Sequence, residues 1–362
     1  MLGHKKADGQ TQKPAHTSDA APQLWQPTRL VLLAIFILLF SASVVWFAWY
    51  TRQPSDNANF SGPAEHIKVG NIGEYSIFNL IAKEKGYFAA NGLDVDITEY
   101  PSGPPAVADL LRGKNDFAIA ADLVGVNALF TNKQLRILSQ VSQQHVFYLI
   151  VRKDKGIAKP ADLRGKKIGV TKKGAGEFFL SRYLNLNGMT TADITVADLS
   201  PTDMMIQLSS GQADGIVIFE PHVYDLIQSM GGNITVFAIQ GEQPTVGLAY
   251  TTEYFTTQKP EVVRRYVASL LAAQTFLKEH DQEARQILAR AMNYDIAYVN
   301  YLWPKIDFSL TLRQSLLIGM EDEARFLIQE HLADQTTAPN FRNYIYFDAL
   351  KQLDPQAVTI SR

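Results

Sequence analysis

Two stretches of this 362-residue chain read alike at an offset of about 96–100 residues. The paired segments are IKVG (67–70) with KIGV (167–170), GEYSIF (73–78) with GEFFL (176–180), NGL (91–93) with NGM (187–189), and LRGKNDFAI (111–119) with SSGQADGIV (209–217). Solenoid repeats have about 20–50 residues, so this period is too long for a solenoid. The duplication instead predicts two lobes built from the same order of elements.

Each copy has the pattern of a strand, a loop, a helix, a strand, a helix and a strand. FAIAA (117–121) and GIVIF (215–219) are unbroken runs of small or branched apolar residues, as expected of parallel strands covered on both faces. The first helix of each copy ends at a glycine, Gly86 or Gly188, which is a common stop after a helix. We therefore predict an α/β fold with a mostly parallel sheet in each lobe.

Two apolar strands connect the copies with each other and with the rest of the chain. HVFYLIVRK (145–153) leaves the first copy, and PTVGLAYTT (244–252) leaves the second. Two extended crossovers of this kind would act as a hinge between the lobes. Apolar residues at helical spacing follow from Pro260 onward, and we expect these helices to pack on the first lobe. A separate helical domain is the alternative.

The segment LVLLAIFILLFSASVVWFAWY (30–50) has 21 residues and no charge. As a helix it would measure about 31 Å, which matches the ~30 Å hydrocarbon core of a bilayer. Trp25, Trp46 and Trp49 lie near its ends, where an interfacial belt of aromatic residues is expected. We predict a single transmembrane helix at 30–50. The alternative is a cleaved signal peptide, with its cleavage site at the Ser-Ala-Ser of 41–43.

The basic residues around this segment predict its orientation. Four lie before it (Lys5, Lys6, Lys13 and Arg29) and one, Arg52, lies close after it. By the positive-inside rule the N-terminus is cytoplasmic, and the main domain is periplasmic or extracellular, anchored in the inner or cytoplasmic membrane. The predicted segments are a disordered cytoplasmic tail (1–29), the membrane helix (30–50), a linker (51–65), the first part of lobe 1 (66–150), lobe 2 (151–244) and a return to lobe 1 with the C-terminal helices (245–362).

Composition excludes several classes of function. The net charge is −2 and the chain has no cysteine, which argues against a nucleic-acid partner and excludes thiolate metal sites, cysteine nucleophiles and a lipidated N-terminal cysteine. The seven histidines show no metal-ligand spacing, and neither a G-x-S-x-G nor a G-x-x-x-x-G-K motif is present. We therefore predict that the protein is not an enzyme and uses no cofactor or metal.

Four segments, in this order, carry a resemblance to a known family. They are IAKEKGYF with NGLDV (81–95), LRGKNDFAIA (111–120), PADLRGKKIGV (160–170) and GQADGIVIFEPH (211–222). They resemble periplasmic solute-binding proteins of ABC importers, in the branch that binds nitrate, taurine, aliphatic sulfonates and the thiamine pyrimidine precursor. The resemblance covers residues 66–362 and implies a type II periplasmic-binding fold that closes around a small solute and delivers it to an ABC permease.

This chain departs from the family in one respect. Members are usually secreted or lipid-anchored, whereas this chain has a predicted membrane helix and no cysteine for a lipid. The departure leaves open a sensing role, in which the same lobes bind a ligand and signal to a partner through the membrane helix. A scaffold that binds no solute is a third reading.

Candidate ligand-binding residues follow the predicted strands, because parallel sheets bind ligands beyond the carboxyl ends of their strands. They are Glu74, Tyr75, Ser102, Gly103 and Asp122 in the first copy and Lys172, Gly174, Gly176, Glu177, Phe219 and Glu220 in the second. Gly174 and Gly176 at a helix start would let backbone N–H groups approach an anion, and Lys172 adds positive charge. A solvated turn is the alternative for this loop.

The carboxylates argue for a different kind of ligand. Glu74, Asp122 and Glu220 suit an amine or a protonated ring nitrogen, although they could instead neutralise the lysines. Tyr75 and Phe219 would sandwich a flat ligand, or they are ordinary packing residues. The sequence leaves sulfonate, nitrate, amine and heteroaromatic solutes as open possibilities.

Overall fold

The computed structural model describes residues 60–361. The predicted cytoplasmic tail, the predicted membrane helix at 30–50 and most of the predicted linker lie outside the described residues. Within 60–361, no helix is both long enough and apolar enough to cross a bilayer.

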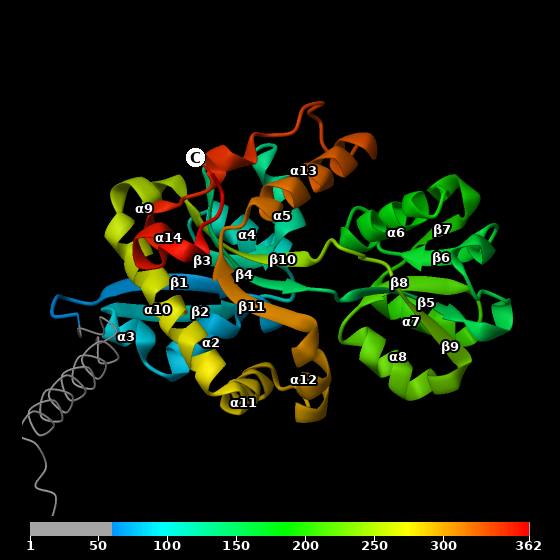
Figure 1. The fold of residues 1–362 in the computed structure, drawn as a ribbon, viewed down its shortest axis with the longest axis horizontal. Helices are drawn as coiled ribbons and strands as arrows, with labels where there is room; N and C mark the ends of the chain where they lie inside the picture. Colours follow the sequence, from blue (N-terminus) through cyan, green and yellow to red (C-terminus); the bar gives the residue numbers. More distant parts are fainter. Residues whose placement is uncertain (1–59, 362) are drawn as a thin grey trace, which may run out of the picture. The chain divides into compact units, whose positions relative to one another are not determined.

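Two separate sheets form the centres of two lobes (Figure 1). The sheet of lobe 1 has the order β11-β4-β10-β3-β1-β2, and the sheet of lobe 2 has the order β7-β6-β8-β5-β9. The strands of lobe 1 are β1 (Glu65–Asn71), β2 (Leu93–Glu99), β3 (Phe117–Ala121), β4 (Leu135–Gln144), β10 (Thr245–Thr252) and β11 (Ile306–Thr311). Those of lobe 2 are β5 (Phe147–Arg152), β6 (Lys167–Val170), β7 (Thr195–Asp198), β8 (Gly215–Phe219) and β9 (Ile234–Ala238).

Helices cover both sheets. The helices of lobe 1 are α2 (Ile77–Glu84), α3 (Tyr87–Ala90), α4 (Gly103–Leu111), α5 (Asp122–Leu129), α9 (Glu253–Gln258), α10 (Pro260–Glu279), α11 (Asp281–Met292), α12 (Ile296–Leu302), α13 (Gln314–Gln329) and α14 (Asp348–Leu353), with the short 3₁₀ helices η1 (Gly73–Ser76) and η6 (Trp303–Lys305). Those of lobe 2 are α6 (Ala175–Leu186), α7 (Pro201–Ser210) and α8 (His222–Met230). Among the C-terminal helices, α10 contacts α2 and α3, and α13 contacts α5.

The duplicated order of elements is confirmed. The first copy runs β1, η1, α2, α3, β2, α4, β3, and the second runs β6, α6, β7, α7, β8. In both copies the first strand lies in the middle and pairs in parallel with the other two. Gly86 and Gly188 follow the first helix of each copy with φ of +74° and +69°, a backbone region that favours glycine.

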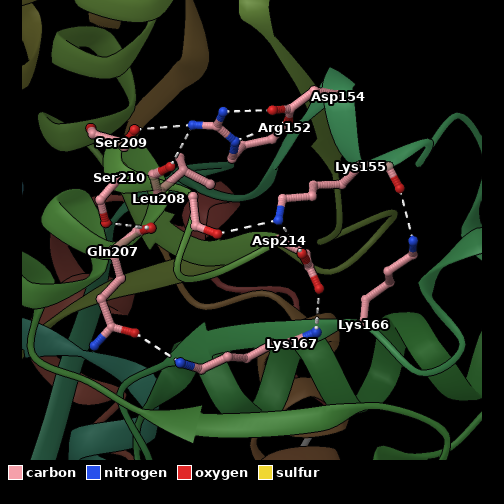
Figure 2. A network of polar contacts seen from close by, with 11 residues as sticks. Arg152, Asp154, Lys155, Lys166, Lys167, Gln207, Leu208, Ser209, Ser210 and Asp214 are labelled. Carbon is pink, nitrogen blue, oxygen red and sulfur yellow. Dashed lines mark hydrogen bonds and ion pairs between the residues drawn. The ribbon is translucent and has the colours of Figure 1, made fainter.

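The duplicated aspartates Asp116 and Asp214 have the same structural role. Each carboxylate accepts a hydrogen bond from a backbone N–H of the neighbouring central strand: Asp116 from Lys68 at 2.8 Å and Asp214 from Lys167 at 2.9 Å. In lobe 2, Asp214 also pairs with Lys155 (Figure 2). This part of the repeated motif therefore ties strands together at the end of the sheet.

Arg152 forms a second set of polar contacts in the same part of lobe 2, as Figure 2 shows. Its guanidinium donates to the carbonyl oxygens of Leu208 and Ser209 at the end of α7, each at 3.0 Å, and pairs with Asp154. A cation is favourable at a helix C-terminus because the last carbonyl groups there lack helical partners. The network thus stabilises lobe 2 locally.

The prediction of mostly parallel sheets is wrong, because both sheets are mixed. In lobe 1, β10 is antiparallel to β3 and β4, and β11 is antiparallel to β4. In lobe 2, β5 is antiparallel to β8 and β9. For β5 and β10 the cause is the direction of the crossovers: a strand that arrives from the other lobe runs against the duplicated strands, whose carboxyl ends point toward that lobe.

The crossovers are two short segments between β4 and β5 and between β9 and β10. Gln240 joins them: its Oε1 accepts from the N–H of Phe147 at 2.8 Å, and its Nε2 donates to Thr245 Oγ1 at 3.2 Å. His145 Nε2 lies 3.0 Å from the carbonyl oxygen of Gly241. The two crossovers are therefore bonded to each other and form one joint.

Candidate functional site

Glu74 lies at the carboxyl end of β1, where the two lobes meet. It is half-buried in η1, beside the fully buried Gln144 of β4. Burial raises the pKa of its carboxyl group, and the nearby carboxylate of Glu220, from lobe 2, raises it further. Two residues predicted from separate loops, Glu74 and Glu220, are therefore brought together.

Glu220, at the end of β8, forms an ion pair across the lobes. It is only 6% exposed, and its carboxylate accepts from Lys305 Nζ at 2.8 Å and from the N–H of Tyr224 at 3.1 Å. Lys305 belongs to η6 of lobe 1, and its Nζ also lies 3.6 Å from the ring centroid of Tyr301. Glu220 does neutralise a lysine, but that lysine is Lys305 and lies far along the chain.

A cluster of four tyrosines, none of them among the predicted site residues, lies beside this ion pair. Tyr224 of α8 packs on Tyr298 and Tyr301 of α12, with centroid distances of 5.4 and 4.9 Å, and Tyr294 packs on Tyr298 at 5.2 Å. Burial raises the pKa of Tyr298 most, and the nearby carboxylates of Glu74 and Glu220 raise it further. We call these four residues the tyrosine cluster. The spacing of four and three residues between Tyr294, Tyr298 and Tyr301 was the available signal, since it is the spacing of one helix face. In the structure Tyr298 and Tyr301 lie in α12, whereas Tyr294 precedes its N-cap residue Asp295.

Tyr75 and Phe219 have different neighbours. Tyr75 packs on β10 so closely that a Cβ on Gly247 would lie 2.5 Å from its Cδ1. Burial raises the pKa of the Tyr75 hydroxyl. Phe219 packs against Phe147 and His222, with ring centroids 5.4 and 5.6 Å away. A stacked ligand between Tyr75 and Phe219 stays a prediction.

Asp122 is buried on another side of the joint. It is 3% exposed at the start of α5 and accepts the N–H groups of Leu123 at 3.1 Å and of Val246, in β10, at 3.2 Å. It also contacts Glu323 of α13, and burial raises its pKa to about 7. Asp122 lines a pocket of about 450 Å³ between the lobes.

The loop before α6 is exposed, and two of its backbone N–H groups donate to carboxylates of the neighbouring elements β7 and α6. The backbone N–H of Lys172 donates to Asp198 Oδ1 at 3.1 Å, and that of Lys173 donates to Glu177 Oε2 at 2.7 Å. Gly174 is the N-cap of α6, and Gly176 is buried against Val170. Glu177 is thus occupied in a local turn, and anion binding by this loop stays a prediction.

Ser102 and Gly103 keep their predicted place at the start of α4. Ser102 is exposed and makes no capping hydrogen bond through its side chain. Gly103 is buried, and a Cβ there would lie 3.0 Å from Ala120 Cβ and 3.1 Å from Val124 Cγ2. Close packing of α4 on β3 is therefore a sufficient reason for this glycine.

Comparison with known proteins by sequence gives the following matches. Residues 74–284 match the family model described as NMT1/THI5 like. A Bacillus subtilis (strain 168) protein, provisionally named as an aliphatic sulfonates-binding protein, is 27% identical over 244 residues, which cover 65% of this chain and 73% of that protein. The formylaminopyrimidine-binding protein of Halalkalibacterium halodurans is 24% identical over 220 residues, which cover 58% and 65%.

Solved structures share the fold. The periplasmic aliphatic sulphonate binding protein SsuA from Escherichia coli has a TM-score of 0.68 and 19% identity, covering 78% of this chain and 92% of SsuA. The desulfurization enzyme DszB has a TM-score of 0.62 and 15% identity, covering 80% of this chain and 98% of DszB. The two-lobed fold is therefore the periplasmic-binding-protein fold. Because it occurs in a binding protein and in an enzyme, the fold alone does not decide between them.

Proposed function

Because the chain belongs to the NMT1/THI5-like family, we propose that it is a solute-binding protein that captures a small polar solute between its lobes. It delivers that solute to an ABC importer and catalyses no reaction. In this proposal a membrane helix at 30–50 tethers the protein, with the N-terminus in the cytoplasm and the lobes on the periplasmic or extracellular side.

The observation that carries this proposal is the joint between the lobes. Each lobe has its own sheet, and two short crossovers connect them. The pair Glu220–Lys305 and the ring contact Tyr224–Tyr298 join one lobe to the other, so both depend on the lobes being close together. A solute held between the lobes would add contacts to this arrangement and shift the population toward it.

The chemistry at the joint favours one class of solute. Two carboxylates, Glu74 and Glu220, lie near the tyrosine cluster, and the neighbouring cation, Lys305, is already paired. A flat ring with an amine or a protonated nitrogen would meet a carboxylate and stack on tyrosine. A sulfonate or nitrate would lie beside two carboxyl groups there, while Lys305 is held by Glu220. The formylaminopyrimidine-binding relative supports the heteroaromatic class.

The test is a binding screen on the purified chain with aminopyrimidines, taurine, methanesulfonate and nitrate, read by calorimetry and by thermal unfolding. We expect an aminopyrimidine to bind. At ~100 times its dissociation constant it should raise the free energy of unfolding by about 2.7 kcal/mol. Glu74→Gln should weaken this binding at least tenfold, because an amide cannot pair with a cation, while Lys172→Gln should leave it unchanged.

Two results would contradict the proposal at different levels. Tightest binding of methanesulfonate or nitrate, lost in Lys172→Gln, would show that the solute class is wrong but that the protein binds solutes. If none of the compounds binds and small-angle scattering shows no compaction with any of them, the solute-binding function itself is wrong.

A further inference from the structure

A pocket lies between the lobes, next to the paired strands β4 and β10. It is on the opposite face of these strands from Glu74. Gln143 of β4 and Val246 of β10 are directly paired, and both line the pocket of about 450 Å³. Their chain neighbours Gln144 and Thr245 are also paired and face the other side, because successive side chains alternate across a sheet. Gln144 lies beside Glu74. The pocket is therefore separate from Glu74, Glu220 and the tyrosine cluster.

Gln140 supplies a buried hydrogen-bond donor at this pocket. It is 1% exposed, and its Oε1 accepts from the backbone N–H of Arg313 and from Thr311 Oγ1, each at 3.1 Å. An N–H partner fixes that atom as the oxygen, so the other amide atom is the nitrogen. Gln140 Nε2 has no partner among residues 60–361. A buried donor without a partner is costly, and an acceptor in the pocket would satisfy it.

Two guanidinium groups at the pocket share one carboxylate. Arg182 of α6, in lobe 2, has an NH1–Asp322 Oδ2 distance of 3.9 Å, and Arg325 of α13, in lobe 1, donates to Asp322 Oδ1 at 3.2 Å. All three residues line the pocket, and the buried Nε of Arg182 lacks a partner in the described part of the chain. The unmet groups at this pocket are thus donors, one from each lobe.

Asp122 and Glu242, two acidic residues that line the pocket, do not exclude an anion from it. Asp122 is occupied by two backbone N–H groups and by Glu323. Burial raises the pKa of both carboxyl groups, which disfavours their charged forms. Glu242, at the rim, is exposed to solvent.

We propose that this pocket binds a small organic carboxylate, which accepts from Gln140 Nε2 in lobe 1 and from the Arg182 guanidinium in lobe 2. A guanidinium fits a carboxylate with two parallel N–H···O bonds. The volume lies within the range of about 300–1,000 Å³ for small-molecule sites, and Val246 and Leu316 provide apolar lining. The bound carboxylate links the lobes and so stabilises their closed arrangement.

The experiment titrates the full chain with sodium benzoate against sodium chloride at equal ionic strength, by calorimetry and thermal unfolding. We expect saturable one-to-one binding of benzoate, and weaker binding of sodium sulfate because sulfate leaves the apolar lining uncovered. Arg182→Gln should weaken benzoate binding at least tenfold. Gln140→Glu should do the same, since it keeps the Oε1 acceptor but replaces the free donor with a negative charge. Arg164→Gln is the control, because Arg164 is also in lobe 2 but pairs with Asp193.

Absence of saturable benzoate binding would overturn the proposal. Benzoate binding that survives Arg182→Gln, or that is lost in Lys172→Gln, would overturn it as well, because the anion would then lie at another site. Sulfate binding tighter than benzoate would exclude an organic occupant. If Gln140→Glu fails to fold, Arg182→Gln decides alone, since that side chain is partly exposed on α6. Glu74→Gln should leave benzoate binding intact, so failure here is distinguishable from failure of the solute proposal.

Discussion

The loops that follow the first strand of each copy hold equivalent places but differ in burial. In lobe 1, Glu74 and Tyr75 are half-buried against the crossover strands, and a Cβ on Gly73 would lie 3.8 Å from the hydroxyl of Tyr294. In lobe 2, Lys172 and Lys173 are exposed. The same position in a duplicated fold therefore supports a buried carboxylate in one lobe and a solvated, basic turn in the other.

The difference shows what a sequence repeat does and does not determine. The repeat places both loops at the carboxyl ends of central strands. The burial of each loop depends on the segments outside the repeat that pack on it, namely the crossover strands and α11 to α12 in the case of lobe 1. The following predictions test whether the buried residues near the Glu74 loop contribute more to stability than the exposed loop at Lys172.

Glu220→Ala has the largest expected effect. It removes the acceptor of Lys305 Nζ and of the Tyr224 N–H, and it should lower the free energy of unfolding by about 3 kcal/mol, because one partner of a buried ion pair is lost. Urea unfolding measures this.

Glu321→Ala is the matched control for Glu220→Ala. Glu321 is an exposed glutamate on α13, and its removal should change stability by less than about 0.5 kcal/mol. Equal effects of the two substitutions would mean that the Glu220–Lys305 pair does not hold the lobes together.

Gly247→Ala should displace the buried loop of lobe 1. The added Cβ would lie 2.5 Å from both Tyr75 Cδ1 and Ser142 Oγ, so Tyr75 must move. Overpacking of this kind costs about 1–3 kcal/mol. The measurement is thermal unfolding together with the near-ultraviolet circular dichroism of the tyrosines. The control is Gly232→Ala, because a Cβ at Gly232 would have open space around it. An unchanged spectrum in Gly247→Ala would contradict the close packing of Tyr75.

Asp122 predicts a pH dependence of stability. Its pKa is raised by burial from 3.8 to about 7, and the folded state therefore binds the proton more tightly than the unfolded state. The resulting stability is fully present below about pH 4 and is lost as the pH rises toward 7, with a slope of at most about 1.4 kcal/mol per pH unit. Unfolding of the parent and of Asp122→Asn between pH 4 and 7.5 measures it. The same slope in both proteins would exclude Asp122 as its source.

The exposed loop of lobe 2 should show the smallest effects. Lys173 has φ of +62°, which disfavours a residue with a side chain, so Lys173→Gly should be neutral or stabilising by about 0.5 kcal/mol. Lys172→Gly, at the neighbouring position without positive φ, should instead destabilise by about 0.5 kcal/mol. Chemical unfolding of both variants checks the difference in sign. A loss of several kcal/mol in either would mean that this loop is not the solvated turn that the structure shows.

The sequence by itself determined the local elements and their order. The apolar runs at 117–121 and 215–219 are strands, the glycines at 86 and 188 end helices, and the duplication corresponds to two lobes. These features depend on short-range patterns of side-chain size, hydrophobicity and backbone freedom, which are present in the sequence. The candidate loops could also be located, because they follow the strands directly.

Only the tertiary structure decided the direction of the connecting strands and the partners of the candidate residues. Glu220 pairs with Lys305, Glu74 meets Gln144 and Glu220, and Asp122 turns toward β10 and α13 instead of joining the other two carboxylates. No local pattern encodes these outcomes, because they depend on which surfaces meet when the chain has crossed twice between the lobes. Burial and pairing then set the charge and chemistry of each group.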